Sequence, residues 1–282
     1  MPITEGKMTF GDGVGGTIEI TRPIFGYKSV INFPFHTVNS EDTHIYSFDP
    51  GAPYDVRYCD CTFVLNATEH AYLIGYINNT MRASNAVEMV LPSGSGFHPF
   101  CPDKGDSGTF TVALEYLGSK GIGEAPYLYF HTNIRITNQG AYPEYALPTE
   151  VSEGSLTIGS VSGIRFPEDW FEPSTEYAAF GSTGRGGTVN FIDRGSYADA
   201  YNTKFKVTSN ESKAAKVIKY LSGTARAASF QITTGTNYYA FNYEKGSSNT
   251  YNVKLNQNDL TVTNNEYNQF EFDLNLNWIS TV

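Results

Sequence analysis

A stretch of nine residues occurs twice in this chain, as "GYINNTMRA" (75–83) and "KYLSGTARA" (219–227). Two more segment pairs occur in the same order in the two halves of the chain. They are "FDPG" (48–51) with "IDRG" (192–195), and "FHPFCPDKGDSGTFTVAL" (97–114) with "YYAFNYEKGSSNTYNVKL" (238–255). The offsets are 144, 144 and 141 residues, so small insertions in loops account for the differences. This period is far longer than the roughly 20–50 residues of solenoid repeats. The matches therefore predict a duplicated domain.

Each copy is predicted to begin with a half-buried strand, because apolar and polar residues alternate with a period of two. The inward positions are Cys59, Cys61, Phe63 and Leu65 in the first copy and Tyr201, Thr203, Phe205 and Val207 in the second. A short strand, a hairpin and a long last strand are expected after the helix that follows. The predicted hairpin turns are "PDKGDSG" and "YEKGSSN".

One helix is predicted in each copy. Asn66 with Glu69, and Thr208 with Glu211, have the spacing of a capping box. Apolar stripes follow at His70, Leu73, Ile74 and Ile77, and at Ala214, Val217, Ile218 and Leu221. Gly223 is suited to a left-handed C-cap. The helices are expected over 66–78 and 208–222, with Tyr201–Trp278 equivalent to Cys59–Ile136.

The predicted fold class is mainly β with one flanking helix per half, as two tandem β-sandwich or barrel domains. The domains are expected at 1–141 and 185–282. Residues 142–184 contain several prolines and are interpreted as the connection plus the leading hairpin of the second unit. An abundance of Gly, Tyr, Phe, Asn, Ser and Thr supports strands and turns over helical bundles.

The charge argues against nucleic-acid recognition. The chain has a net charge of −10, and residues 1–184 hold 9 Lys/Arg against 21 Asp/Glu, while residues 185–282 hold 10 against 8. No basic stripe is available for phosphates. The N-terminus does not resemble a secretory signal and no apolar run suggests a membrane span, so folding in a cytosol is expected. Three cysteines in such a chain do not suggest a disulfide framework.

Catalytic motifs are absent from the sequence, and no enzymatic activity or cofactor is expected. "GDGVGG" (11–16) fits a dinucleotide-binding pattern, but no strand is expected before it and it leads into the strand-like "TIEI" rather than a helix, which favours a simple turn. One metal hypothesis is open. Cys59, Cys61, His98 and Cys101 supply four soft ligands, as in structural zinc or iron–sulfur sites. The alternative is that these cysteines pack as small apolar side chains.

The second half, from "NFIDRGSYADAYNTKFKVTSNESKAAKVIKYL" to "NQFEFDLNLNW", resembles the tail-assembly proteins of bacteriophages, namely distal tail, hub and tube-type β domains. The resemblance covers 185–282, and 44–136 through the internal repeat. It implies a virion protein assembled in the host cytoplasm, a trimeric or hexameric ring, and neighbouring tube and baseplate proteins. DNA would pass through such a ring without specific binding, and no membrane partner is implied.

A channel of this kind is expected to present acidic or neutral side chains to DNA, because like charges repel phosphate. The main alternative is a β-sandwich binding module, such as an adhesin or a carbohydrate-binding virion protein. Its support is the wealth of Tyr, Trp and Asn.

Overall fold

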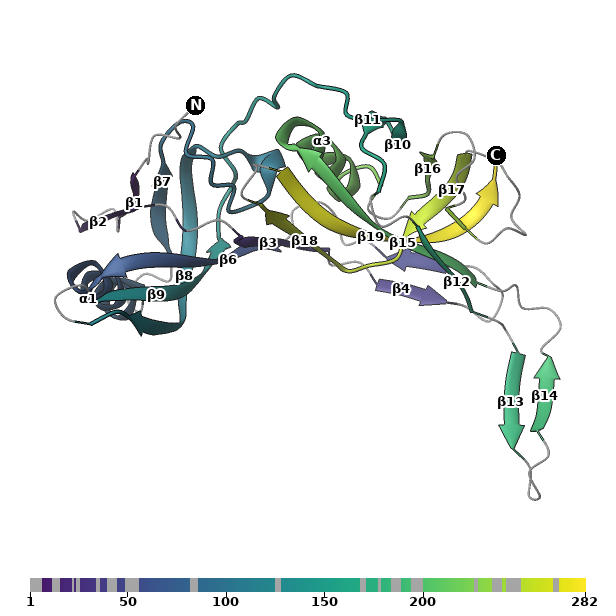
Figure 1. Cartoon of the computed structure of the whole chain (residues 1–282), viewed down its shortest axis with the longest axis horizontal. Coiled ribbons are helices and arrows are strands. Elements are labelled where there is room, and N and C mark those ends of the chain that lie inside the picture. Colours follow the sequence, from purple (N-terminus) through teal and green to yellow (C-terminus); the bar gives the residue numbers. More distant parts are fainter. Residues whose placement is uncertain are drawn as a thin grey trace.

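The computed structural model describes residues 7–11, 16–21, 23, 26–33, 36–39, 45–48, 56–81, 86–124, 128–167, 171–176, 179–183, 189–193, 200–225, 228–234, 240–241, 250–265 and 269–282. These residues form a mainly β fold with one large antiparallel sheet of fifteen strands (Figure 1). Within the same residues there are two α-helices and two separate hairpins, β4–β5 and β13–β14.

The elements of the first half are β1 (Lys7–Gly11), β2 (Thr17–Thr21), β3 (Lys28–Asn32), β4 (His36–Asn39), β5 (Ile45–Phe48), β6 (Val56–Asn66), α1 (Ala67–Tyr76), the π-helical turn η2 (Ile77–Met81), β7 (Val87–Leu91), the 3-10 turn η3 (Pro102–Lys104), β8 (Gly108–Ile122) and β9 (Tyr129–Asn138). Those of the second half are β10 (Leu156–Ile158), β11 (Val161–Ile164), β12 (Glu172–Glu176), β13 (Ala179–Thr183), β14 (Val189–Asp193), β15 (Ala200–Asn210), α3 (Glu211–Ser222), β16 (Phe230–Thr233), β17 (Thr250–Leu255), β18 (Asp259–Asn264) and β19 (Gln269–Thr281).

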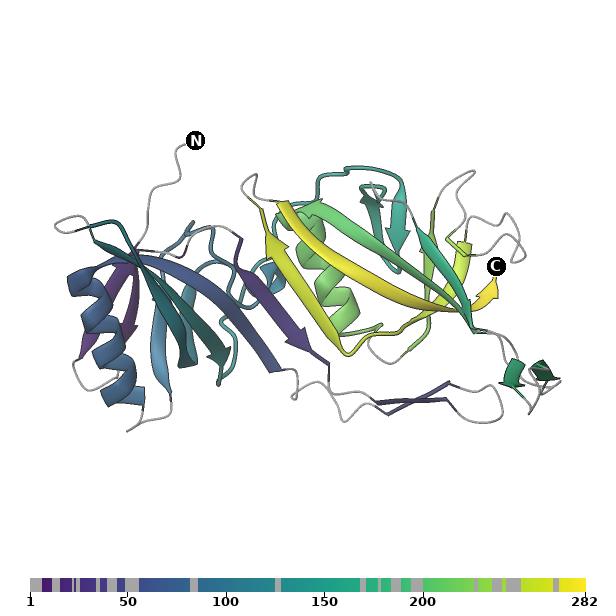
Figure 2. The same cartoon turned by 60° about the horizontal axis from the view of Figure 1, so that its bottom comes forward.

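The two halves have the same strand order. In the first half the neighbours run β3-β6-β9-β8-β7-β1-β2, and in the second they run β12-β15-β19-β17-β16-β10-β11. The long strand β8 corresponds to β17 and β18 together, because β8 pairs with β9 along both parts of its length with a bulge between Tyr116 and Gly118. Helices α1 and α3 follow equivalent strands, as the repeat predicts, and run in similar directions in Figure 2.

The strand registers also coincide when the two helix N-caps, Asn66 and Asn210, are aligned. Ser29 lies opposite Cys59, seven residues before Asn66, and Pro173 lies opposite Thr203, seven residues before Asn210. The equivalent of Cys59 is therefore Thr203. The predicted alignment, which matched Cys59 with Tyr201, is wrong by two residues in this strand.

The alignment is wrong because the second helix begins two residues later than predicted. The capping box of α1 is confirmed: Asn66 Oδ1 accepts from the Glu69 amide, and Glu69 Oε2 accepts from the Asn66 amide, both at 2.9 Å. In α3 the N-cap is Asn210 rather than Thr208, and Lys213 occupies the position of Glu69. Glu153, from the connecting segment, accepts from the Asn210 amide at 3.0 Å instead.

Other local predictions differ in detail. Gly223 is the C-cap of α3, but its φ is −102°, so it is not left-handed. Residues 77–81 form a π-helical turn after α1 instead of ending the helix at 78. Contrary to expectation, "GDGVGG" does follow a strand: Gly11 ends β1, and β1 pairs with β2 as a hairpin. The predicted turn "YEKGSSN" (243–249) lies outside the described residues.

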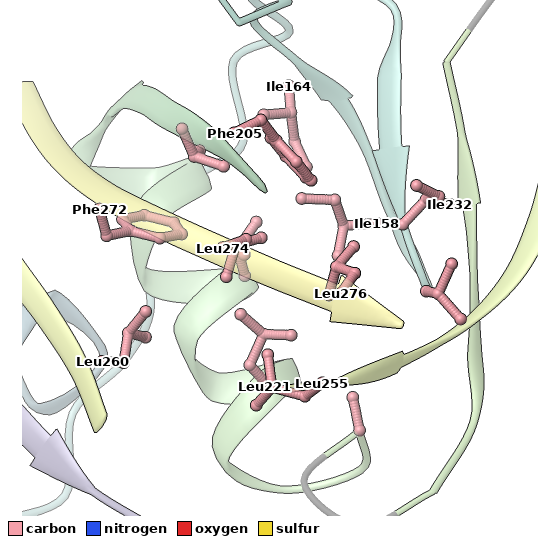
Figure 3. Packing of buried hydrophobic residues seen from close by; sticks show 14 of the residues in the cluster. Ile158, Ile164, Phe205, Leu221, Ile232, Leu255, Leu260, Phe272, Leu274 and Leu276 are labelled. Atoms are coloured by element: carbon pink, nitrogen blue, oxygen red, sulfur yellow. The ribbon is translucent and has the colours of Figure 1, made fainter. Parts of the chain in front are cut away.

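Two hydrophobic clusters fill the spaces between the helices and the sheet. In the second half, all four predicted stripe residues of α3 are fully buried. Figure 3 shows Leu221 of α3 near Leu274 and Leu276 of β19, with Ile158 of β10 beside them. Fully burying one such side chain contributes about 1.5–3 kcal/mol. In the first half Leu73 and Ile77 of the predicted stripe are buried, whereas His70 and Ile74 are only half-buried.

Candidate functional site

The most distinctive site in the described residues is the junction of the two halves. Strand β18 of the second half pairs antiparallel with β3 of the first, from Asp259 opposite Asn32 to Thr263 opposite Lys28. Two backbone hydrogen bonds extend the pairing: the Gly26 amide donates to Asn264 O at 3.1 Å, and the Phe33 amide donates to Asn258 O at 2.6 Å. The pairing makes one continuous sheet of the two halves.

Tyr27 links the halves at one end of this pairing. Its hydroxyl accepts hydrogen bonds from the His98 amide and from Asn264 Nδ2, both at 3.0 Å. It also lies 3.4 Å from Gly96 O, to which it donates. Burial raises the pKa of Tyr27, so the hydroxyl stays protonated. The tyrosine thereby holds the loop before η3 against β18.

A buried ion pair lies beneath the same loop. Arg57 of β6 donates to Asp103 Oδ1 at 2.6 Å, and the two side chains are 2% and 0% exposed. Arg57 also donates to Phe100 O at 3.0 Å and to Ser222 Oγ of α3 at 3.3 Å. Burial lowers the pKa of Arg57, but the Asp103 carboxylate outweighs this and raises it above its ordinary value. The charge is therefore permanent, and it needs its partner.

The start of α3 receives a second set of contacts from the first half. The buried His98 ring lies edge-on to Phe270, with centroids 5.1 Å apart, and its Nε2 is 3.9 Å from Glu211 Oε1. Tyr145 of the connecting segment donates to the same Glu211 oxygen at 2.7 Å. Burial lowers the pKa of His98, although Glu211 acts in the opposite direction. Neutral histidine is thus favoured at this junction.

The four residues of the metal hypothesis are all described and all buried. Cys59 and Cys61 lie on the core face of β6, Cys101 precedes η3 with a φ of 73°, and His98 packs on Phe270. Among the described residues no three His, Cys, Asp or Glu side chains are grouped to hold a metal ion. Burial raises the pKa of Cys59 and of Cys101, as expected of cysteine thiols that pack among apolar side chains. The geometry thus fits the packing interpretation better.

A groove of about 440 Å³ lies beside α1 and β2, away from the junction. Its lining includes Tyr72, Tyr76, Asn79 and Thr17. A second groove, of about 560 Å³, lies on the sheet face opposite α3, and its lining contains lysines as well as carboxylates. In the part of the chain that is described, no helix is long and apolar enough to cross a membrane.

The sequence patterns did not reveal the junction, although one signal was available. Arg57 lies on the same strand face as Cys59 and Cys61, and a charge on a core face indicates a buried partner. A scan against protein-family models finds no family that matches the chain, and a search of curated proteins finds no significant relative.

Proposed function

We propose that this protein is a structural component of a bacteriophage tail or baseplate, forming a hub, distal-tail or tube-adaptor ring around the DNA channel. The two halves would be tandem tube-like β domains. The observation that carries the proposal is the repeated strand order, with the halves joined edge to edge by β18 and β3. It is supported by the sequence resemblance of the second half to tail-assembly proteins.

A contact between two equivalent units, repeated between chains, generates either a closed ring or an open filament. Three copies of a duplicated chain would place six similar units in a ring, and six copies would place twelve. A ring of this kind needs no cofactor and no catalytic residue. Its partners would be further copies of the chain and the adjacent tail proteins, and its location would be the virion tail.

The polar face of the sheet is a candidate for the channel wall. At the junction it presents Lys28, Lys204 and Lys206 together with Asp259, Glu271 and Asp273. Lys204 Nζ lies 3.3 Å from Asp273 Oδ2, so part of this charge is paired. With equal numbers of lysines and carboxylates this face is close to neutral, which is compatible with the acidic or neutral lining expected of such a channel. It would still offer no continuous basic track to bind phosphate.

The test is the state of the purified full-length chain. Closed rings of uniform diameter in electron micrographs, with a trimer or hexamer mass by light scattering, are the expected result. A monomer at all concentrations up to about 100 μM, well above the micromolar range of ordinary specific contacts, would overturn the proposal.

The alternative, a binding module for carbohydrate, is favoured by the groove beside α1. Tyr72 is 70% exposed, and aromatic rings next to amide and hydroxyl groups suit the stacking and hydrogen bonding of sugars. Glycan-array binding that is lost in Tyr72→Ala, by a chain that stays monomeric, would favour this function over the ring.

A further inference from the structure

Two strand edges in the described structure have one partner where their counterparts have two. Strand β3 lies between β6 and β18, whereas its counterpart β12 pairs only with β15 among the described strands. Strand β18 lies between β19 and β3. Its counterpart, residues 118–122 of β8, pairs only with β9 among the strands that the structure describes. The open edges lie near opposite ends of the molecule (Figure 1).

Three large apolar side chains at or next to the open edge of β8 are exposed: Ile122 lies within residues 118–122, and Tyr116 and Leu117 directly precede them. Tyr116, Leu117 and Ile122 are 41%, 45% and 42% exposed. In the counterpart strand β18, which is covered by β3, Leu260 and Val262 are 0% and 1% exposed. Clustered exposed apolar side chains on a strand edge are typical of an interaction site.

Helix α1 shows the same difference. Ala215 of α3 is fully buried at the junction, and its equivalent, Ala71 of α1, is exposed. Glu211 and Ser222, which bind the first half, correspond to Ala67 and Asn78, which are also exposed. The stripe Ala67, Ala71 and Asn78 therefore lies open beside the open edge of β8.

We infer that this open surface, residues 118–122 of β8 with the exposed stripe of α1, binds strand β12 of a second copy of the chain. The contact would repeat the β18–β3 junction between chains. This inference rests on the proposed ring function and names the surfaces that would form the ring.

The known register of the junction specifies the pairs. In the first half Ser119 lies opposite Thr132 of β9. In the second half Val262 lies opposite Phe272, the equivalent position of β19, so Ser119 is the equivalent of Val262. In the second half Glu172 lies opposite Lys204 of β15. In the first half Lys28 lies opposite Asp60, the equivalent position of β6, so Glu172 is the equivalent of Lys28. Because Thr263 pairs with Lys28, Lys120 is expected opposite Glu172.

Opposite charges favour this contact between chains, and a proline limits its backbone hydrogen bonds. Lys120 and Glu172 are exposed and of opposite sign, which favours the pair across strands. Pro173, expected opposite Ser119, has no amide hydrogen, so this contact can form fewer hydrogen bonds than β18 and β3 do. The interface between chains would therefore be weaker than the junction within one.

Cysteine cross-linking tests the register directly. Lys120→Cys and Glu172→Cys chains, made separately, are mixed and mildly oxidised. Residues directly opposite on antiparallel strands have Cβ atoms about 4.5–5.5 Å apart, close enough for a disulfide with slight movement. The matched control mixes Lys120→Cys with Ser174→Cys, a diagonal neighbour about 7–8 Å away. The native cysteines are buried and give the background.

Cross-linking of the first pair at more than about threefold the yield of the diagonal control, read by mass spectrometry of peptides, is expected, because directly opposite residues lie closer than diagonal neighbours. Rings without this cross-link, or equal yields for both mixtures, would overturn the inference and leave the proposed function standing. The cross-link in open filaments would support the inference and contradict the ring. A strictly monomeric chain would overturn both.

Charge reversal is the second test. Lys120→Glu and Glu172→Lys are each expected to weaken self-association about threefold or more, and the double variant to restore it, because exposed cross-strand pairs contribute modestly. Both sites are exposed, so folding should be unaffected. A double variant no better than either single one would overturn the pairing.

Discussion

Helices α3 and α1 follow equivalent strands, but their surroundings differ. In α3 a second face, besides the core stripe, is covered: Ser212 and Ala215 are 5% and 0% exposed beneath the contacts from the first half. In α1 the equivalent residues, Thr68 and Ala71, are exposed. The cover of α3 comes from η3 and its flanking loop, not from the helix itself. The equivalent helices of the two halves thus differ in one surface, which is covered in α3 and exposed in α1.

The largest expected effect comes from removing the ion pair that anchors this cover. Asp103→Ala should lower the free energy of unfolding by about 3–5 kcal/mol, because it leaves the Arg57 guanidinium buried without its counter-charge. Chemical denaturation followed by circular dichroism measures the change.

The matched control is Asp60→Ala. Asp60 binds Arg135 at 2.7 Å on the first-half sheet, but both side chains are about one-third exposed, at 34% and 36%. Water screens such a pair, so the loss should be about 0–1 kcal/mol. Equal losses in the two variants would show that the junction is no more buried than an ordinary surface.

A pair of leucine substitutions sharpens the comparison of the helices. Ala215→Leu adds volume where α3 is fully covered and should cost about 1–3 kcal/mol of unfolding free energy. Ala71→Leu adds the same volume at the open position and should change stability by less than about 0.5 kcal/mol. Both alanine and leucine are good helix formers, so helix propensity does not distort the comparison. Thermal unfolding of the two variants, measured side by side, tests this difference in stability.

Local patterns predicted much of this fold. The period of two located β6 and β15 and the faces that they bury, and the stripe Ala214, Val217, Ile218 and Leu221 located the core side of α3. Both signals depend only on neighbours within about two turns or a few strand residues. The internal repeat extended these elements to an equivalent pair of helices.

What the patterns missed depends on residues distant in the chain. Thr208 and Asn210 both suit an N-cap, and the choice of Asn210 is supported by Glu153, which is 57 positions away. The junction joins 28–32 to 259–263, and no local period encodes such a pairing. For the metal hypothesis, spacing alone could not show that the buried His98 ring packs edge-on against Phe270 of the second half.

The smallest expected effect concerns pH and again separates the covered helix from the open one. His98 is buried at the start of α3, and burial lowers its pKa below the ordinary value of about 6.5. Because the folded state holds neutral histidine more strongly than the unfolded chain does, His98 stabilises fully above the unfolded pKa. As pH falls below about 6.5, the unfolded chain takes up the proton first. The free energy of unfolding should therefore decrease by up to about 1.4 kcal/mol per pH unit until the folded pKa is reached.

Denaturation of the wild type and of His98→Gln between pH 7.5 and about 5 measures this term, above the range in which ordinary carboxylates titrate. The variant should lose the extra slope even if it is less stable throughout. His70→Gln, on the open helix α1, retains His98 and should therefore retain the slope. If His98→Gln follows the wild-type pH dependence, then His98 is protonated as readily in the folded chain as in the unfolded one. The first-half loop would in that case not exclude water from the start of α3, and the contrast between the two helices would be one of shape alone.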